Sequence, residues 1–262
     1  RSTLKPFQSA SSISTGTDIK YKFSKKEIAI TCASHHGEQQ HVKTVQSILK
    51  KIKLSEKDLE CGFHFPLNKI NKAKLYAKKL QQTNIYNNCS GKHSGLLAMI
   101  KNHGYETKGY INHNHPIHKN INDYIEKQTE EKPKHFATDG CSLPTPYHTL
   151  FTLSKMYMNL LTSPKGTPLN KVYNAMTGFP EMISGSKGFD TYFMRTFKGQ
   201  AVSKGGAEGM QALAIKKKNG ECFSLALKVS DGNHRANYIS CIKILQYLNI
   251  INSQKSKKLL SF

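Results

Sequence analysis

Arginine is scarce in this sequence. Of its 39 basic residues 36 are lysines, and the arginines are Arg1, Arg195 and Arg235. A formal charge of +22 favours nucleic acid or an anionic surface as a partner. Proteins that read bases and phosphates, however, depend on the forked guanidinium group, and here the lysines are spread along the whole chain. We therefore interpret the charge as a solvated basic surface and expect no nucleic-acid partner.

Long apolar runs are missing as well. No stretch approaches the roughly 20 apolar residues of a membrane-spanning helix, and no short apolar core follows a basic segment as in a signal peptide. The 262 residues, 37% of them hydrophobic, suffice for a real core. We therefore expect a soluble, cytoplasmic protein without a membrane partner.

No pair of cysteines has the C-x-x-C spacing of a redox or metal motif. The six cysteines are far apart in the sequence, at Cys32, Cys61, Cys89, Cys141, Cys222 and Cys241. Because a chain of this length needs no disulfides to fold, we expect free thiols in a reducing compartment.

Internal repeats and long linkers are also absent, so we expect a single domain over residues 1–262. Residues 27–34 alternate and are rich in β-branched side chains, which predicts a strand. Helical periodicity predicts helices over 42–52, 96–100 (ending at Gly104), 116–125, 150–161 and 234–248.

The pattern of apolar residues changes after Gly199, from helical to strand-like. Residues 200–204 are predicted to form a strand, and residues 209–216 and 222–229 form an antiparallel hairpin around the turn at 218–220. The end of the chain, residues 253–262, is expected to be a loose tail. This order predicts an α+β fold in which helices pack on an antiparallel sheet, with a helical insertion.

The densest cluster of reactive side chains is NNCSGKHSGLL, residues 87–97. It is not a phosphate-binding loop, because Tyr86 and His93 stand where a Walker motif needs a glycine and a hydroxyl. Cys89 and Lys92 are three residues apart and therefore share one face of a helix. A thiol beside an amine at a helix start indicates a reactive cysteine or half of a metal site, and a purely structural role stays open.

A nucleophile is indicated by RSTLKPF at the start of the chain. Ser2 and Lys5 form an S-x-x-K pair, in which one helical turn places an amine beside a hydroxyl whose proton it can take. Two further pairs occur, in a lysine-rich helix and among glycines: Ser47 with Lys50, and Ser184 with Lys187. The first pair is favoured, because S-T-x-K-P is the form common in penicillin-binding proteins.

Enzymes with this motif also carry a K-[TS]-G sequence on a strand of the active site. Lys204, Gly205 and Gly206 lie at the end of the predicted strand, before a hairpin and a helix. A lysine there can polarise a substrate carboxylate or help proton transfer, and glycines let the backbone approach the substrate. A plain glycine turn between strands is the alternative.

Eight motifs, in order along nearly the whole chain, resemble one enzyme family: RSTLKPFQ, ASHHGEQQHV, CGFHFPL, NNCSGKHSG, DGCSLPTP, SGSKGFDT, SKGGAEGMQALAI and KVSDGNHRA. The chain resembles the serine-dependent L-asparaginases of the Rhizobium etli inducible type, also called thermolabile or type II asparaginases. The resemblance implies a β-lactamase-like fold, usually dimeric, and hydrolysis of L-asparagine to L-aspartate and ammonia.

The resemblance also implies roles for single residues. It implies a catalytic set of nucleophile, amine partner, relay hydroxyl and second lysine, which are Ser2, Lys5, Ser34 and Lys204. It implies a zinc site beside them that tunes or organises the active site, with the ligands Cys89, Lys92 and Cys141. Candidates for binding the α-amino and α-carboxylate groups of the substrate are His93, Asp231 and Arg235.

The chain also departs from the family pattern. Members usually carry a further segment of about a strand pair before the serine motif, and we expect this N-terminal strand segment to be missing. His118 stands where glutamine is expected, and His36 where a small residue is common. The alternative is therefore a catalytically inactive β-lactamase-like binding protein or a truncated remnant of the family. A β-lactamase is disfavoured, because Ser34, His35 and His36 lack the asparagine of an S-x-N motif.

Overall fold

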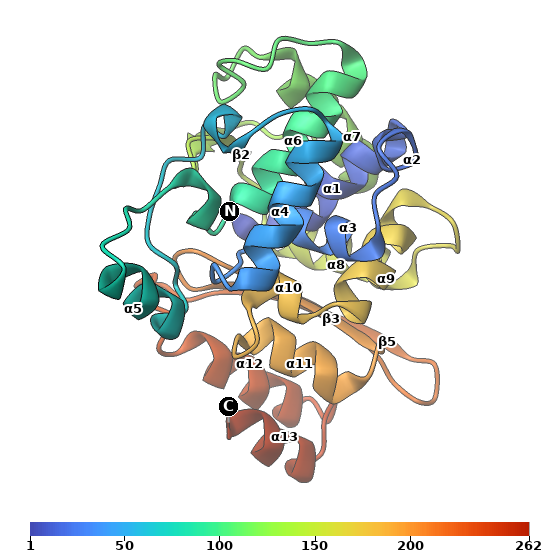
Figure 1. Cartoon of the computed structure of the whole chain (residues 1–262). Helices are drawn as coiled ribbons and strands as arrows, with labels where there is room; N and C mark the ends of the chain where they lie inside the picture. Colours follow the sequence, from blue (N-terminus) through green and yellow to red (C-terminus); the bar gives the residue numbers. More distant parts are fainter. Residues whose placement is uncertain (262) are drawn as a thin grey trace.

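The computed structural model describes residues 1–261 and combines many helices with small antiparallel sheets (Figure 1). The helices are α1 (Lys5–Ser14), α2 (Thr17–Lys20), α3 (Lys25–Thr31), α4 (Gln39–Lys51), α5 (Lys69–Ala77), α6 (Ser90–His103), α7 (Pro116–Thr129), α8 (Leu150–Thr162), α9 (Pro168–Gly178), α10 (Glu181–Ser184), α11 (Phe189–Phe197), α12 (Asn237–Tyr247) and α13 (Ser253–Leu260). Short 3-10 helices are η1 (Ser2–Leu4), η2 (Glu56–Asp58) and η3 (Asn84–Tyr86). This mixture confirms the predicted α+β class, and the β-lactamase-like arrangement stays a prediction.

The strands form one three-stranded and one two-stranded antiparallel sheet. The strands are β1 (Phe136–Thr138), β2 (Pro144–Pro146), β3 (Ala201–Gly206), β4 (Met210–Lys216) and β5 (Cys222–Lys228). The larger sheet has the order β3-β4-β5, with Lys204 opposite Ala212 and Leu213 opposite Leu225. The predicted strand and hairpin after Gly199 are therefore confirmed.

Alternation along β3 divides the core between the two faces of this sheet. Val202, with Ala212 and Ala214 of β4, joins the larger core around α1, α3, α6, α8 and α9. Ala201, with Leu213 and Ile215, packs instead on the phenylalanines of α11 and on α12 and α13. In Figure 1 these last helices lie below the sheet and the larger helical group lies above it.

The predicted strand at 27–34 is wrong, because residues 27–31 belong to α3 and the helix ends before Cys32. Ser24 and Glu27 make a capping box: the Ser24 hydroxyl accepts from the Glu27 amide at 3.2 Å, and the Glu27 carboxylate accepts from the Ser24 amide at 2.7 Å. This cap outweighs the β propensity of Ile28, Ile30 and Thr31. The buried face of α3 then packs on α4, α6 and α9.

The predicted loose tail is also wrong for the described residues. Asn252 caps α13 by accepting a hydrogen bond from the Lys255 amide at 2.9 Å, and Leu259 packs into the second core. The predicted helices at 42–52, 96–100, 116–125, 150–161 and 234–248 correspond to α4, α6, α7, α8 and α12. Gly104 ends α6 with a left-handed conformation, as expected for a helix terminus.

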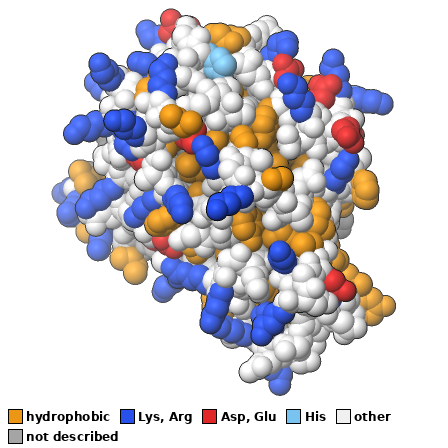
Figure 2. All heavy atoms as spheres, turned by 90° about the vertical axis from the view of Figure 1, so that its right-hand side faces the viewer, with side chains coloured by type: hydrophobic (Ala, Val, Ile, Leu, Met, Phe, Trp, Pro, Cys, Tyr) orange, Lys and Arg blue, Asp and Glu red, His pale blue; other side chains and the backbone are white. Residues whose placement is uncertain are grey.

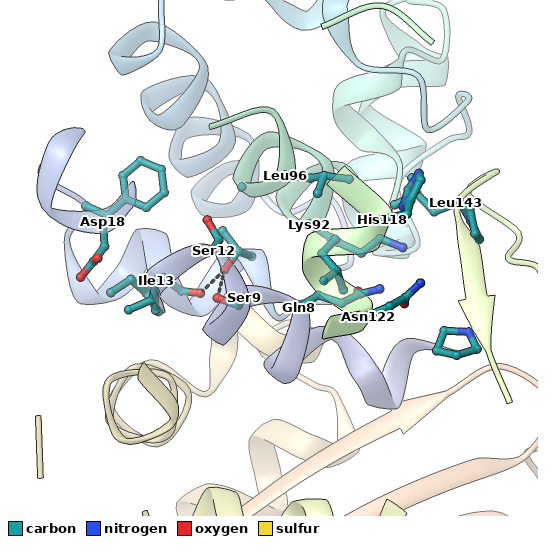
Figure 3. Close-up of a pocket in the computed structure, with 17 residues that line it drawn as sticks. Gln8, Ser9, Ser12, Ile13, Asp18, Lys92, Leu96, His118, Asn122 and Leu143 are labelled. Atoms are coloured by element: carbon teal, nitrogen blue, oxygen red, sulfur yellow. Dashed lines mark hydrogen bonds between the residues drawn. The ribbon is translucent and has the colours of Figure 1, made fainter. Parts of the chain in front are cut away.

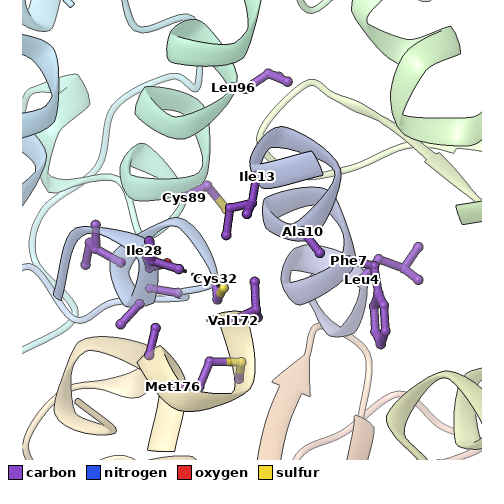
Figure 4. Packing of buried hydrophobic residues seen from close by; sticks show 14 of the residues in the cluster. Leu4, Phe7, Ala10, Ile13, Ile28, Cys32, Cys89, Leu96, Val172 and Met176 are labelled. Atoms are coloured by element: carbon purple, nitrogen blue, oxygen red, sulfur yellow. Dashed lines mark hydrogen bonds between the residues drawn. The ribbon is translucent and has the colours of Figure 1, made fainter. Parts of the chain in front are cut away.

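Two glycines of the NNCSGKHSG motif let α6 approach α3 closely. A Cβ on Gly91 would lie 2.2 Å from the Ile30 carbonyl oxygen, and one on Gly95 would lie 2.5 Å from the Thr31 methyl group. The two positions are four residues apart and share one face of α6. Figure 4 shows the result, with Cys89 at the start of α6 beside α1 and Cys32 at the end of α3.

Within residues 1–261, no helix is long and apolar enough to cross a lipid bilayer. Basic side chains are scattered over the face drawn in Figure 2 and do not gather in one stripe.

Candidate active site

Lys5 opens α1 and is buried, with 1% of its surface exposed. Its amine donates to the Ala33 carbonyl oxygen at 2.6 Å. The same nitrogen lies 3.0 Å from Ser34 Oγ and 3.2 Å from Cys89 Sγ. One buried lysine therefore contacts both the predicted relay hydroxyl and a predicted zinc ligand.

The backbone around Ser34 holds its hydroxyl in place. The Ser34 amide donates to the Ile183 carbonyl at 2.9 Å, and the next amide, of His35, donates to the Asn88 carbonyl at 3.1 Å. The buried His35 ring bonds Ser90 Oγ at 2.8 Å through Nε2 and accepts from the Gly37 amide at 3.1 Å through Nδ1. Hydrogen bonds therefore hold Ser34 to α10 and the next residue, His35, to the start of α6.

Lys204 reaches the same hydroxyl from the sheet. It lies on β3, on the face that packs against the helices, and its amine is 2.9 Å from Ser34 Oγ and 2.6 Å from the Gly205 carbonyl oxygen. Burial lowers the pKa of Lys204 to about 8, although the nearby Asp190 carboxylate opposes the shift. Two buried amines thus flank one hydroxyl, an arrangement that can pass a proton along hydrogen bonds.

Ser2 lies in η1, immediately before the turn that carries Lys5. Its side chain is 9% exposed, and η1 packs on β3 and β4. The neighbouring Thr3 carbonyl accepts from the Tyr157 hydroxyl at 2.9 Å, which fixes this turn. Among the residues that the structure describes, the Ser2 hydroxyl has no hydrogen-bond partner, so the structure brings together Lys5, Ser34 and Lys204 without a bond from Ser2 to Lys5.

A cluster of thiols and an amine adjoins these residues. The Lys92 amine lies 2.8 Å from Cys141 Sγ and 3.7 Å from Asp139 Oδ2, and the Cys89 thiol hydrogen-bonds Cys141. This bond from Cys89, together with the Lys92 charge, lowers the pKa of Cys141 to about 5 against the opposing effect of burial. The pKa of Cys89 is raised to about 12, because this thiol donates its hydrogen to Cys141 and because it is buried.

The donor set of this cluster fits zinc. Cys89, Lys92 and Cys141 are each at most 5% exposed, and two thiols with one amine suit the tetrahedral nitrogen and sulfur coordination of zinc. Within residues 1–261, no group of three histidine, cysteine or carboxylate side chains is placed to hold a metal ion. This also holds for the present cluster when Lys92 is not counted. A zinc site would therefore depend on Lys92, and binding would release the protons of Lys92 and Cys89.

A cavity between α1, α6 and α7 reaches this cluster (Figure 3). Lys92 and His118 line one end of it and Asp18 lines the other, with Ser9 and Ser12 of α1 between them. His118 donates through Nε2 to the Tyr110 carbonyl oxygen at 2.8 Å, and burial lowers its pKa to about 4. The chain thus places a neutral imidazole where glutamine was expected.

The predicted substrate-binding residues are not brought together. His93 is fully buried, and its Nδ1 accepts from the Tyr110 hydroxyl at 2.7 Å, because that hydroxyl already accepts from the Glu60 amide at 2.8 Å. Asp231 and Arg235 pair with each other at 2.7 Å on an exposed surface. Their assignment to the substrate stays a prediction.

Two carboxylates beside the amines were not predicted from the sequence. Asp190 lies 3.9 Å from the Lys204 amine, and Asp139 accepts from Arg1 Nη1 at 3.0 Å and adjoins Lys92. The Arg1 side chain also pairs with Glu208 of the β3–β4 turn. The only available signal was the position of these carboxylates inside motifs: Asp139 in DGCSLP and Asp190 in SGSKGFDT.

A family model described as L-asparaginase II matches residues 1–262. Among curated proteins, none matches the chain.

Proposed function

Because the chain belongs to the L-asparaginase II family, we propose that it hydrolyses the side-chain amide of L-asparagine to L-aspartate and ammonia. The observation that carries the proposal is the pair of buried amines on one hydroxyl, with Lys5 and Lys204 at 3.0 and 2.9 Å from Ser34 Oγ. Such a chain can remove a proton from a nucleophile and deliver one to a leaving amine.

The proposed nucleophile is Ser2. Its hydroxyl turns toward the Lys5 amine, loses its proton and attacks the amide carbon of the substrate. The first amides of η1 have no partner within their own helix and are candidates for stabilising the oxyanion. Ammonia leaves with a proton delivered through Ser34, which leaves an acyl-enzyme ester on Ser2. Water then hydrolyses this ester, and the proton returns along the same path.

Lys204 is proposed to keep a positive charge beside this path. Its position at the end of β3, next to Gly205 and Gly206, supports contact with a substrate carboxylate or with the departing amine. A Cβ on Gly206 would lie 3.2 Å from Met210 Cβ and 3.4 Å from the Thr3 methyl group, so glycine there lets η1, which carries Ser2, pack closely on the end of β3.

Zinc is proposed as a ligand of Cys89, Lys92 and Cys141, for the reasons of donor chemistry given above. When bound, it would supply a positive charge that keeps both thiols deprotonated. The contact between Cys89 and Lys5, at 3.2 Å, supports a role of this cluster in orienting the amine of the nucleophile pair. Attack, proton transfer and acyl transfer remain the work of the serines and lysines.

We also propose that the protein is a homodimer in a reducing, cytoplasmic compartment. The family resemblance supports the dimer, and the six free thiols support the compartment. Size-exclusion chromatography with light scattering tests the dimer directly, because a mass near 29.4 kDa would contradict it.

Ammonia release from L-asparagine tests the proposal. The wild-type chain should release ammonia, Ser2→Ala should release none, and Ser34→Ala should lose at least about 100-fold in kcat. Ser47→Ala is the matched control, because Ser47 with Lys50 has the same sequence spacing on the outer helix α4. Denaturing mass spectrometry of a quenched reaction should find the acyl adduct on the peptide that contains Ser2.

The family membership does not favour the alternative of a non-catalytic binding protein. Binding of L-asparagine by calorimetry without ammonia release, in zinc-loaded protein that unfolds cooperatively, would establish that alternative instead. Undiminished release by Ser2→Ala would keep the activity and overturn the choice of nucleophile.

A further inference from the structure

Asp190 is a buried carboxylate beside the amine chain. It lies in the first turn of α11 and is 4% exposed. Its Oδ1 accepts from Ser203 Oγ at 2.7 Å and from Gln211 Nε2 at 2.9 Å. Its Oδ2 accepts from the Gly205 amide at 2.9 Å and lies 3.9 Å from the Lys204 amine. Both carboxylate oxygens therefore accept hydrogen bonds from residues of β3 and β4 next to Lys204.

The geometry of β3 explains how one carboxylate reaches residues on both faces. Ser203 and Gly205 point to the α11 side of the strand, whereas Lys204 points to the α1 side. In the sheet as described over residues 1–261, β3 is an edge strand that pairs only with β4. Asp190 bonds the Ser203 and Gln211 side chains on the α11 side of the sheet, and its other oxygen accepts from the Gly205 amide and adjoins the Lys204 amine.

Within the described residues, Asp190 is the one carboxylate at ion-pair distance from Lys204. The other titratable groups that act on Lys204 are the Lys5 amine and the thiols of Cys89 and Cys32. The imidazole of His36, on the loop after α3, also interacts with both Lys204 and Asp190. A lysine that is 1% exposed needs a partner for its charge, and Asp190 supplies the nearest one.

We propose that Asp190 is a positioning residue that holds the Lys204 ammonium, and with it the end of β3, against the Ser34 hydroxyl. The inference rests on the proposed amide hydrolysis and deepens it, because it assigns the charge of the site to Lys204. The carboxylate touches neither Ser2 nor Ser34 and acts through the lysine and the strand.

Asp190→Asn isolates the charge from the hydrogen bonds. The Gln211 Oε1 atom is buried without a partner, so a rotation of the Gln211 amide would present an acceptor to the NH₂ group that this substitution introduces. The oxygen of the introduced side chain can still accept from the Gly205 amide. The matched control is Ser203→Ala, which removes one hydrogen bond to the carboxylate at 2.7 Å and leaves the charge.

The pH profile of kcat/KM gives the first test. The wild type should lose activity above the Lys204 pKa of about 8. Loss of a carboxylate at this distance should move that basic limb of Asp190→Asn down by roughly one pH unit or more, since an adjacent opposite charge stabilises the protonated amine. Ser203→Ala should keep the wild-type limb. A loss in Asp190→Asn by the same factor at every pH would overturn the proposal in favour of a purely structural role.

A second measurement does not depend on turnover. Lysine labelled at Cε with carbon-13 allows NMR titration of single amines, and Lys204→Arg identifies the Lys204 signal. The expected result is a lower midpoint for Lys204 in Asp190→Asn than in the wild type. An unchanged midpoint would overturn the inference even in an active enzyme. Absence of ammonia release by the wild type would instead overturn the proposed function and leave this titration decisive for Asp190.

Discussion

Lys5 is the residue at which the amine chain meets the thiol cluster. Its nitrogen has three neighbours within 3.2 Å: the Ala33 carbonyl, the Ser34 hydroxyl and the Cys89 thiol. A lysine with fixed acceptors on three sides has little freedom to leave the site. Removal of the Cys89 thiol should therefore take away one of the three contacts of the Lys5 amine and leave those with Ala33 and Ser34.

Zinc binding can be tested at the level of single ligands. Cys89→Ser and Cys141→Ser should each lower the zinc content of protein dialysed against the metal from about one ion per chain to well under half, because a hydroxyl is a poor replacement for a thiolate. Elemental analysis of the dialysed protein measures this.

Cys222→Ser is the control, since Cys222 lies on the half-exposed strand β5. Equal zinc content in Cys89→Ser and Cys222→Ser would exclude Cys89 as a ligand.

At the scale of elements, the crossing of α3 and α6 sets the site. The close approach at Gly91 brings Cys89, at the start of α6, and Lys92, in its first turn, next to the residues that follow α3. Gly91→Ala should cost about 2 kcal/mol or more of unfolding free energy, because its methyl group would meet the backbone oxygen of Ile30 at 2.2 Å. Urea unfolding followed by circular dichroism measures the cost.

Gly178→Ala is the matched substitution for this comparison. Gly178 is also helical, at the end of α9, and a Cβ there would meet nothing within 4 Å. The change should be neutral or stabilising by a few tenths of a kcal/mol. A loss in Gly91→Ala no larger than that in Gly178→Ala would show that the two helices can separate freely.

Among the α-helices that the structure describes, α5 has the fewest buried residues. Leu75 is its one buried residue, and Ile70 and Tyr76 are 61% and 55% exposed. Trypsin should therefore cut first at the lysines between 69 and 79, because local opening there disturbs little of the core. Mass spectrometry of a brief digest identifies the site. First cleavage at Lys257 or Lys258, in α13, would contradict this ranking of local stability.

At the scale of the whole molecule, several buried histidines are held neutral. Burial lowers the pKa of His93 to about 3 and that of His118 to about 4, and it lowers the pKa of His35 well below the ordinary value of 6.5. The unfolded chain therefore binds protons that the folded chain refuses. Their contribution to stability is complete above pH 6.5 and is lost as the pH falls through these lowered values.

The unfolding free energy should consequently decline steadily from pH 7 to pH 4. His118→Gln should flatten this decline by about 2 to 3 kcal/mol, because an amide can keep the bond to the Tyr110 carbonyl and does not titrate. Urea unfolding at a series of pH values measures both slopes. Parallel curves for His118→Gln and wild type would mean that His118 titrates normally in the folded state.

Much of this molecule could be predicted from its sequence where the signal is local. The periodic helices α4, α7 and α8 and the hairpin of β4 and β5 were predicted, because each carries its own pattern of apolar residues. Helix α3 was not predicted, because its three β-branched residues favour a strand and hide the shorter signal of the capping box. Helix α13 was not predicted at the end of the chain, because Leu259 is buried only by its packing with residues of α11 and α12.

The same distinction holds for the candidate site. Lys5, Ser34 and Lys204 were found through motifs, and the structure places both amines within 3.0 Å of Ser34 Oγ. Asp190 could not be found in this way, because its contact with Lys204 depends on how α11 packs on β3. A contact between a helix and a strand leaves no spacing rule in the sequence.

The net charge of +22 is consistent with its interpretation as a solvated surface. The basic side chains in Figure 2 are interrupted by apolar and acidic groups, and several lysines pair locally, as Lys119 does with Asp123 at 2.6 Å. Three lysines, Lys5, Lys92 and Lys204, are instead buried at the site. The chain therefore uses lysine for two different purposes, and only burial distinguishes them.

The contact between Cys89 and Lys5 has a spectroscopic consequence. A buried thiol that keeps its hydrogen absorbs in an infrared window where few other protein groups vibrate, and the frequency of that S–H stretch depends on its hydrogen bonds. Cys89 is such a thiol and lies 3.2 Å from the Lys5 amine. The difference spectrum between zinc-free wild type and zinc-free Cys89→Ala would therefore report on the environment of this lysine, before any substrate or metal is added.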